Sequence, residues 1–386
     1  MSIGNLSWGL GGGAADEIVE GGIMLAGPQT GAYSKLSSYF FFPSSNISAP
    51  IKSNFNPSYG NSQCAYGRGH FHLMGQTRDS RYWNIRDPIR IAPQTGRSQV
   101  VTTTGQEAVH DNMMWNVGYS TGRAAGGYFM RIPYNNVPRL GDVQVGGGSG
   151  SFAGWTIHTD VLPSDTMPAD AVNIWRGPVY NPDTDSWLIW NTTNILRTQD
   201  HGATWSSYNS PAPANTITSI VHGNPAGVNG TSKFILTESS YNCNRVWHST
   251  NDGQNWTSHG TGSNMAFISN THWNRTDNKW VMAGGHWASP SINSRIQTSL
   301  DGVTWTMVYQ GTQPQGSLFH IHGDNQGNYI AVGSPYTNAT GYTDTNVFLY
   351  STNNGVNWSQ GTLPLTVRIF SGNPGLLAHG DPSDNL

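Results

Sequence analysis

The sequence predicts an all-β fold built from repeated four-stranded antiparallel sheets, and three observations lead to it. An eight-residue motif recurs four times, as TQDHGATW, STNDGQNW, TSLDGVTW and STNNGVNW. Its glycines, at positions 202, 253, 302 and 355, are 51, 49 and 53 residues apart, close to the ~50-residue period of some propeller blades. Only 11% of the 386 residues are charged, so the charged side chains that favour helices are scarce.

Each copy of the motif is typical of a tight turn between two strands. The short polar side chain before the glycine can bond backbone N–H groups, and the glycine supplies a positive φ. The Trp three positions later begins the outgoing strand and buries a large apolar surface. In the third copy Leu300 stands where an Asp usually stands, so we expect this turn to close differently. The residues given this structural role are Asp200, Gly202, Trp205, Asp252, Gly253, Trp256, Asp301, Gly302, Trp305, Asn353, Gly355 and Trp358.

A second pattern, a polar turn followed by an apolar strand, recurs seven times and indicates hairpins. The copies are GRGHFHLMG, AGGYFMRI, NPDTDSWLIW, VNGTSKFIL, NRTDNKWVMAGG, DNQGNYIAVG and NPGLLAHG. Degraded copies of the first motif precede the clear ones, since Trp155 lies 50 residues before Trp205. Each unit reads in the order strand, hairpin, strand, strand, motif, strand, which makes a four-stranded blade. We therefore predict a seven-bladed β-propeller closed by two strands from each terminus, with six blades plus an N-terminal arm as the alternative.

The domain prediction follows from composition. Residues 1–20 hold too many glycines to pack and are expected to form a flexible arm, and residues 21–386 a single propeller domain. No run of eighteen apolar residues exists and no signal peptide is recognisable, so we expect neither membrane insertion nor export. A net charge of −3 gives no sign of a nucleic-acid surface. Cys64 and Cys243 fall in different predicted blades, which indicates free thiols.

The repeated motif resembles the Asp-box, or BNR, repeat S-x-D-x-G-x-T-W of sialidases and other Asp-box propellers. The resemblance implies that the motif is a structural hairpin between the outer strands of a blade, far from the ligand site. It also implies a test for sialidase chemistry, which needs three arginines, an acid, and a Tyr activated by Glu. The FMRIP stretch resembles the family's first arginine motif with one extra residue, and no Glu follows position 238. The candidates are Arg131, Asp160, Glu238, Arg245, Arg295 and Tyr342.

Two softer patterns remain. His70 and His72, like His320 and His322, lie on one face of a strand and could form a metal pair, but no third ligand can be named. We therefore predict no metal site and no cofactor. Aromatic side chains beside polar residues could instead stack on sugar rings, although each could equally fill an interface between blades. The candidate ligand-binding residues are Trp273, His286, Trp287, Tyr336 and Tyr342.

Low Lys, abundant Gly, Asn, Ser, Thr and Trp, and the lack of an export signal resemble the composition of phage tail and fibre proteins. This resemblance implies a non-enzymatic virion structural or host-surface recognition propeller, assembled in the host cytoplasm. Its expected partners are other virion proteins or further copies of itself, with a cell-surface glycan as a candidate ligand and no nucleic acid. The alternative function is a sialidase-like glycoside hydrolase, and the alternative location is that of a cytoplasmic or non-classically released soluble protein.

Overall fold

We describe a computed structural model of the chain. The residues that it describes are 23–28, 36–41, 50–52, 63–67, 70–78, 83–91, 98–100, 115–120, 127–133, 143–146, 156–159, 161–162, 175–212, 216–225, 232–239, 245–262, 265, 267–288, 291–311, 316–323, 327–337, 341–343, 345–367 and 377–379. Before residue 118 and in 377–379 it describes the backbone alone. Over these ranges no helix has the length and apolar character needed to cross a membrane.

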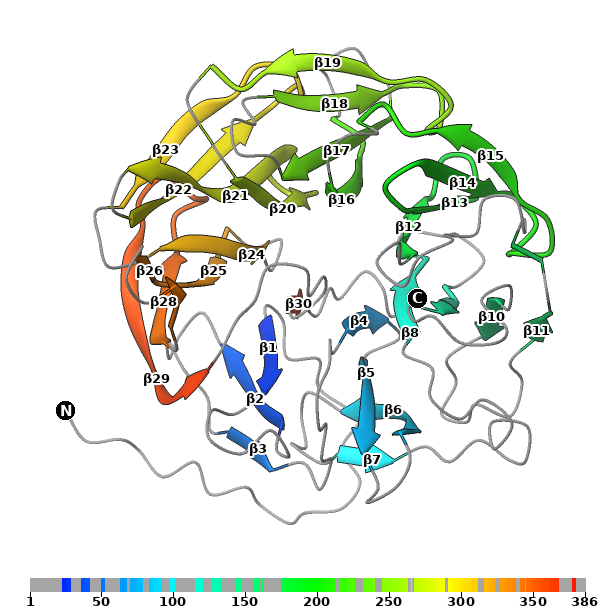
Figure 1. Ribbon diagram of the computed structural model, residues 1–386, viewed down its shortest axis with the longest axis horizontal. Coiled ribbons are helices and arrows are strands. Elements are labelled where there is room, and N and C mark those ends of the chain that lie inside the picture. The colour runs from blue at the N-terminus through cyan, green and yellow to red at the C-terminus, as the bar shows by residue number, and fades with distance from the viewer. Residues whose placement is uncertain are drawn as a thin grey trace.

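The strands pair into antiparallel sheets arranged around a ring, which confirms the predicted all-β propeller architecture (Figure 1). We call each four-stranded sheet a blade. One comprises β4 (Gln63–Gly67), β5 (His70–Arg78), β6 (Trp83–Ile91) and β7 (Ser98–Val100). The next comprises β8 (Trp115–Tyr119), β9 (Phe129–Pro133), β10 (Val143–Gly146) and β11 (Thr156–His158). After it come β12 (Arg176–Asn181), β13 (Ser186–Trp190), β14 (Asn194–Thr198) and β15 (Ser206–Asn209).

The two following blades share one continuous sheet. The first holds β16 (Thr216–Gly223), β17 (Lys233–Ser239), β18 (Arg245–Ser249) and β19 (Thr257–Gly260). The second holds β20 (Phe267–Asn274), β21 (Lys279–Ala288), β22 (Ser291–Ser299) and β23 (Thr306–Gln310). Ser239 pairs with Phe267 and joins them. A further blade holds β24 (Ser317–Gly323), β25 (Tyr329–Ser334), β28 (Thr345–Ser351) and β29 (Ser359–Val367). Its inserted hairpin, β26 (Tyr336–Thr337) and β27 (Gly341–Tyr342), pairs back onto β22.

Strands from both ends of the chain meet in one sheet, but not two from each end as predicted. Its order is β3-β2-β1-β30, with β1 (Ile23–Pro28), β2 (Leu36–Phe41), β3 (Pro50–Lys52) and β30 (Leu377–His379). Three of these strands therefore come from the N-terminal side and one from the C-terminal side. The third N-terminal strand is β3, whose residues Pro50, Ile51 and Lys52 pair with β2. The predicted arm at residues 1–20 and the degraded motif at Trp155 lie outside the described residues.

The first strand in sequence lies nearest the axis of the ring in every blade except the closing sheet, where β30 does (Figure 1). These inner strands contact one another in the order β4, β8, β12, β16, β20, β24 and β30, and β30 contacts β4. Hydroxyl groups help to join two of them, because Thr218 Oγ1 donates to the carbonyl of Ile268 at 2.9 Å. The inner strands thus carry the contacts that hold neighbouring blades side by side.

Apolar side chains fill the space between blades. Phe234 and Leu236 of β17 pack with Leu188 of β13, towards the β12–β15 blade. Ile235, between them in sequence, packs with Trp280 of β21, towards the β20–β23 blade. Successive strand residues alternate between faces, so the β16–β19 blade is covered on both sides. The same alternation shows towards which neighbouring blade a polar side chain near a strand end points.

Three of the four motif turns close in the same way. In the turns around Gly202, Gly253 and Gly355 the glycine N–H donates to a hydroxyl oxygen four positions earlier, at 3.0, 2.9 and 3.0 Å. The Trp indole N–H donates back to the glycine carbonyl at 3.1, 3.0 and 3.0 Å. The glycine and the residue before it both have positive φ. A methyl group at Gly253, whose φ is 79°, would also meet Leu188 of the preceding blade at 2.6 Å.

The turn around Gly302 closes differently, in line with the expectation from Leu300. Its glycine N–H donates to Ser299 Oγ, three positions earlier, at 2.8 Å. Trp305 then lacks the bond to the glycine carbonyl, and its buried indole N–H has no partner within the described residues. The β22–β23 register shifts between Ile296 and Gln297, leaving Val308 as an extra residue in β23. The tighter turn is thus compensated by a bulge.

Candidate functional site

The two ends of each blade carry different residues. In an antiparallel blade, the turns between first and second strands and between third and fourth strands lie at one end. We call this the box end because it holds the motif turns. The connections from second to third strand, and from one blade to the next, lie at the other end, which we call the loop end.

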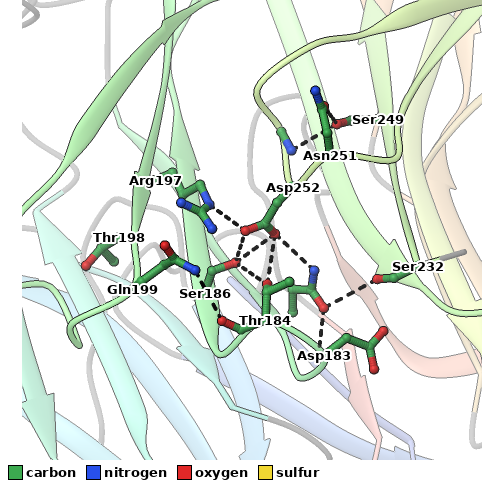
Figure 2. Close-up of polar contacts among 12 residues, drawn as sticks. Asp183, Thr184, Ser186, Arg197, Thr198, Gln199, Ser232, Ser249, Asn251 and Asp252 are labelled. Carbon is green, nitrogen blue, oxygen red and sulfur yellow. Dashed lines mark hydrogen bonds and ion pairs between the residues drawn. The ribbon is translucent and has the colours of Figure 1, made fainter.

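At the box end, one carboxylate joins two blades (Figure 2). Asp252, in the turn between β18 and β19, is only 8% exposed. It accepts hydrogen bonds from Asn181 Nδ2 at 2.9 Å, Thr184 Oγ1 at 3.1 Å and Ser186 Oγ at 2.8 Å, all in the preceding blade. Arg197 of the same blade forms an ion pair with it through Nε. The carboxylate is therefore fully used in holding the blades together.

In the next blades a lysine, in place of the Ser186 hydroxyl, bonds the motif turn that follows. Ser186, Lys233 and Lys279 are the first residues of their blades' second strands. Lys233 Nζ donates to the carbonyl of Asp301 at 2.9 Å, and Lys279 Nζ donates to the carbonyl of Asn354. The motif turns around Gly253, Gly302 and Gly355 thus bind the preceding blade. No local pattern in the sequence identifies these partners, although an alignment of the hairpin patterns places all three at one position.

At the loop end, the shared sheet brings polar residues of two blades together. Paired positions run from Ser239 to Phe267, from Phe267 to Gly285 and from Gly285 to Ser294. Glu238 and Arg245 lie at the start of this series, and His286 and Arg295 lie at its far side. Four of the residues singled out from the sequence thus gather on two neighbouring blades.

His286 and Arg295 face the same space between blades. By alternation His286 shares a face of β21 with Trp280 and Met282, which pack towards the β16–β19 blade. Arg295 lies opposite Gly284, on the face of β22 that also carries Gln297. Gln297 Nε2 donates to the carbonyl of Thr261, in the connection from that blade. We call these three residues, His286, Arg295 and Gln297, the loop-end cluster.

The loop-end cluster contains an imidazole in its neutral form beside a guanidinium. Burial lowers the pKa of His286, and the positive charge of Arg295 lowers it further. Burial also lowers the pKa of Arg295, which is 9% exposed. His286 Nδ1 is buried without a hydrogen-bond partner within the described residues. At neutral pH the loop-end cluster can therefore offer both a proton acceptor and a cation.

Trp287 and Tyr336 meet on the opposite face of the same strand end. Their ring centroids are 5.6 Å apart at an interplanar angle of 57°. The hairpin that carries Tyr336 pairs with β22 through Ser291 and Thr337. Tyr342 lies across that hairpin from Tyr336, and only its backbone is described. Three predicted ligand residues thus come from one corner of the molecule.

A second polar cluster lies between the β12–β15 and β16–β19 blades. Glu238 has a side chain only 1% exposed, whereas that of Arg245 is 50% exposed. Arg245 Nε donates to Glu238 Oε1 at 3.2 Å, and its guanidinium carbon lies 5.5 Å from the centroid of the Trp247 ring. Arg176 of the neighbouring blade donates to the carbonyl of Ile217, which pairs with Glu238.

The other predicted site residues are more scattered. Arg131 lies in β9, opposite Gln144 and Val117, and its side chain is not described. Asp160 lies outside the described residues. Trp273 lies at the box end, where its ring centroid is 4.3 Å from that of Trp280. The structure therefore brings Glu238 and Arg245 into contact but places Trp273 far along its blade from the loop end.

The histidine pairs show no completed metal site. No group of three or more His, Cys, Asp or Glu side chains in the described ranges is placed to hold a metal ion. His320 is buried, its Nε2 has no partner among described residues, and burial lowers its pKa to about 4. His322 packs instead against His272 of the neighbouring inner strand, with ring centroids 4.3 Å apart. For His70 and His72 the backbone alone is described.

No family model and no curated protein matches the sequence. Solved structures do share the fold. A protein from Bacteroides uniformis, provisionally assigned as a 6-phosphogluconolactonase, is 12% identical, with a TM-score of 0.55 over 90% of this chain and 98% of its own. A Bacteroides fragilis protein with the same provisional assignment is 12% identical, with a TM-score of 0.55 over 90% and 97%. The periplasmic gluconolactonase of Pseudomonas aeruginosa is 12% identical, with a TM-score of 0.54 over 91% and 97%.

These matches correct the functional prediction. The predicted non-enzymatic virion or host-surface recognition propeller, and its sialidase-like alternative, are wrong on this comparison. The three solved structures named above share the fold over nearly the whole chain, and they are assigned as lactonases. Composition misled because a propeller's need for glycine turns and tryptophan packing gives similar residue usage in proteins of different function. At 12% identity the likeness itself establishes the fold alone.

Proposed function

We propose that this protein is a hydrolase that opens the ester ring of a sugar lactone, and that the reaction takes place at the loop-end cluster. The observation that carries the proposal is the neutral, partly buried His286 beside the buried guanidinium of Arg295. Such a pair supplies the two functions that ester hydrolysis needs, a base for water and a positive charge for the developing oxyanion.

The steps follow from these two groups. His286 accepts a proton from a water molecule while the water oxygen bonds to the lactone carbonyl carbon. Arg295 stabilises the negative charge that forms on the carbonyl oxygen. When the intermediate collapses, the bond between the carbonyl carbon and the ring oxygen breaks, and the ring oxygen takes the proton from the imidazolium. The product is an open-chain hydroxy acid, which releases its acid proton to solvent.

Two further features support the assignment. The solved structures with this fold include proteins assigned to lactone hydrolysis, as described above. Gln297 lies two residues after Arg295 on the same face of β22 and is fully buried. Its bond to the Thr261 carbonyl holds this face of β22 against the neighbouring blade. A base and a cation held on paired strands keep their spacing better than groups on loops.

The test is hydrolysis of gluconolactone and 6-phosphogluconolactone, followed as acid release above the spontaneous rate. We expect His286→Gln to lower kcat by roughly 100-fold or more, as for a general base. Arg295→Gln should lower it by a similar factor, as for an oxyanion donor, and Arg295→Lys by less. The control is His259→Gln, which changes a partly buried histidine on the outer strand β19. Equal rates in wild type and His286→Gln, or no turnover of either lactone, would contradict the proposal.

We infer in addition that the ring has seven blades, formed by residues 21–386. The series of inner-strand contacts from β4 to β30 and back supports this count. We also infer that the motif turns are of the Asp-box type. Their hydroxyl and indole hydrogen bonds, together with those of a carboxylate at Asp200 and of carboxamides at Asn251 and Asn353, support that assignment for the turns around Gly202, Gly253 and Gly355. An experimental structure of the full chain would test both inferences.

A further inference from the structure

The motif turn between β28 and β29 contains an Asn-Gly pair, the dipeptide in which an asparagine loses its side-chain amide most readily. The sequence has two such pairs, Asn354–Gly355 in this turn and Asn229–Gly230, which lies outside the described residues. In the other three motif turns a histidine or an aspartate precedes the glycine. Among the four motif turns this one alone therefore carries a labile amide at that position.

The reaction joins a backbone nitrogen to a side-chain carbon. The nitrogen of Gly355 loses its proton and attacks Cγ of Asn354, the C–N bond of the side-chain amide breaks, and the nitrogen leaves as ammonia with a proton from water. A second water molecule opens the five-membered imide to aspartate or to its isoaspartyl isomer. Glycine favours the attack because it has no side chain to obstruct it. A carboxylate therefore replaces a neutral amide in the turn.

In the folded chain Gly355 is held by two hydrogen bonds within the turn. Its N–H donates to Ser351 Oγ at 3.0 Å, and its carbonyl accepts from Trp358 Nε1 at 3.0 Å. Gly355 is also buried, so its N–H is shielded from bulk water. A nitrogen that is bonded to a hydroxyl and shielded from base does not readily lose its proton. The attack therefore requires the turn to open first.

Asn354 is held at both of its backbone polar groups. Its N–H donates to the carbonyl of Gly327 at 2.9 Å, and its carbonyl accepts from Lys279 Nζ of the preceding blade. Its side-chain Oδ1 lies against Gly327, where a methyl group would collide with it. The backbone is left-handed at both residues of the pair, with φ of 60° at Asn354 and 73° at Gly355. These contacts restrict the rotation that brings Cγ onto the Gly355 nitrogen.

We propose that Asn354 is a site of spontaneous deamidation that the intact motif turn keeps closed, so that the reaction proceeds only when this turn opens. The bond from the Gly355 N–H to Ser351 Oγ is the contact that controls it. The isoaspartyl product has one more backbone atom, so its formation disrupts the bond with Lys279 that joins the turn to the preceding blade. The site lies at the box end and is independent of the proposed hydrolysis.

Incubation of the full chain at mildly alkaline pH tests the site, with peptide mass spectrometry to separate the Asn, Asp and isoaspartyl forms of residue 354. We expect the folded wild type to deamidate roughly 100-fold or more slowly than the chain unfolded in urea. Ser351→Ala should speed the reaction of the folded chain by at least about tenfold, because the Gly355 N–H loses its partner. Ser351→Thr should react as slowly as the wild type, since Thr198 Oγ1 holds the Gly202 N–H in the same way.

The matched control is Ser249→Ala, which removes the equivalent bond to the Gly253 N–H and leaves the Gly355 turn intact. It should deamidate at Asn354 at the wild-type rate, and it reproduces the general loss of stability that such a change causes. Equal rates in Ser351→Ala and Ser249→Ala would overturn the proposal. So would a folded wild type that reacts as fast as the unfolded chain, a comparison that needs no substitution and holds even if Ser351→Ala does not fold. Lactone turnover does not enter this result.

Discussion

Asp252 is the residue that most directly holds two blades together. Four side chains of the preceding blade donate to its carboxylate, and one of them is the guanidinium of Arg197. Removing one partner of a buried ion pair leaves the other charge uncompensated, which costs about 3–5 kcal/mol. Asp252→Ala should therefore lower the free energy of unfolding by about that amount, measured by urea denaturation.

The matched control is Asn251→Ala in the same turn. Asn251 accepts from Ser249 Oγ at 3.0 Å and from the Asn255 N–H at 2.9 Å, and among the described residues it makes no such contact with the preceding blade. Its loss should cost about 1 kcal/mol. If the two variants unfold at the same urea concentration with the same slope, the carboxylate does not join the blades as described.

The tryptophans of the motif turns allow a second comparison. Trp256 donates its indole N–H to the Gly253 carbonyl at 3.0 Å, whereas the buried indole N–H of Trp305 has no partner in the described structure. Trp305→Phe removes an unsatisfied donor and Trp256→Phe removes a hydrogen bond. We expect Trp305→Phe to be less destabilising by about 1 kcal/mol, measured by thermal or urea unfolding. A larger cost for Trp305→Phe would show that its N–H is paired.

His286 gives the proposed activity a specific pH dependence. Burial and the charge of Arg295 lower its pKa below the usual value of about 6.5. The base is active when neutral, so kcat should be level around neutral pH and fall as the pH drops through the lowered pKa. The measurement is kcat against pH for wild type and His286→Gln. An acid limb centred above pH 6.5, or one that persists unchanged in His286→Gln, would argue against His286 as the base.

At the scale of the element, β24 carries a titrating group in an apolar position. Burial lowers the pKa of His320 to about 4, below its unfolded value of about 6.5. Between these values the unfolded chain binds a proton that the folded chain does not, so stability is complete above pH 6.5 and is lost as the pH falls towards 4. The slope is about 1.4 kcal/mol per pH unit for each such group.

His222 of β16 shows the same lowering, also to about 4. His320→Leu should therefore remove about half of the loss of unfolding free energy between pH 6.5 and 4 that these two groups cause. Urea denaturation across that range measures it, with His259→Gln as the control. An unchanged pH slope in His320→Leu would show that this histidine is accessible to protons in the folded chain.

Some elements could be predicted from the sequence because their cause is local. The motif turns depend on hydroxyl, amide and glycine groups within eight residues, so their existence and the exception at Leu300 can be read directly. The pairing of the β26–β27 hairpin with β22 could not, because it joins Thr337 to a strand of another blade. The make-up of the closing sheet could not be predicted either, because the strand β3 that completes it is defined by its pairing with β2.

The candidate site was predictable only in part. Arg295, His286, Glu238 and Arg245 were each singled out, but for sialidase or sugar-stacking chemistry. The sequence alone did not show which face of each strand packs against which neighbouring blade. That information places His286 with Arg295 between one pair of blades, and Arg245 with Glu238 between another. Arg176 was missed, because its contact with the Ile217 carbonyl spans 41 positions and leaves no local pattern.

At the scale of the whole molecule, stability and proposed chemistry occupy opposite ends. The box end holds contacts between blades that use their polar groups fully, as around Asp252 in Figure 2. The loop end holds buried or half-buried charged groups that face spaces between blades, namely Arg295, Glu238 and Arg245. Substitutions at the box end should therefore change unfolding free energies, and substitutions at the loop end should change binding and turnover.

The central claim is that His286 and Arg295 form a lactone-opening site. The most direct measurement is kcat for gluconolactone and 6-phosphogluconolactone, above the spontaneous rate, for wild type, His286→Gln and His259→Gln. The account predicts turnover by wild type and His259→Gln, and a loss of roughly 100-fold or more in His286→Gln while its unfolding free energy stays within about 1 kcal/mol of wild type. Wild-type turnover retained in folded His286→Gln, or turnover absent in wild type, would contradict it.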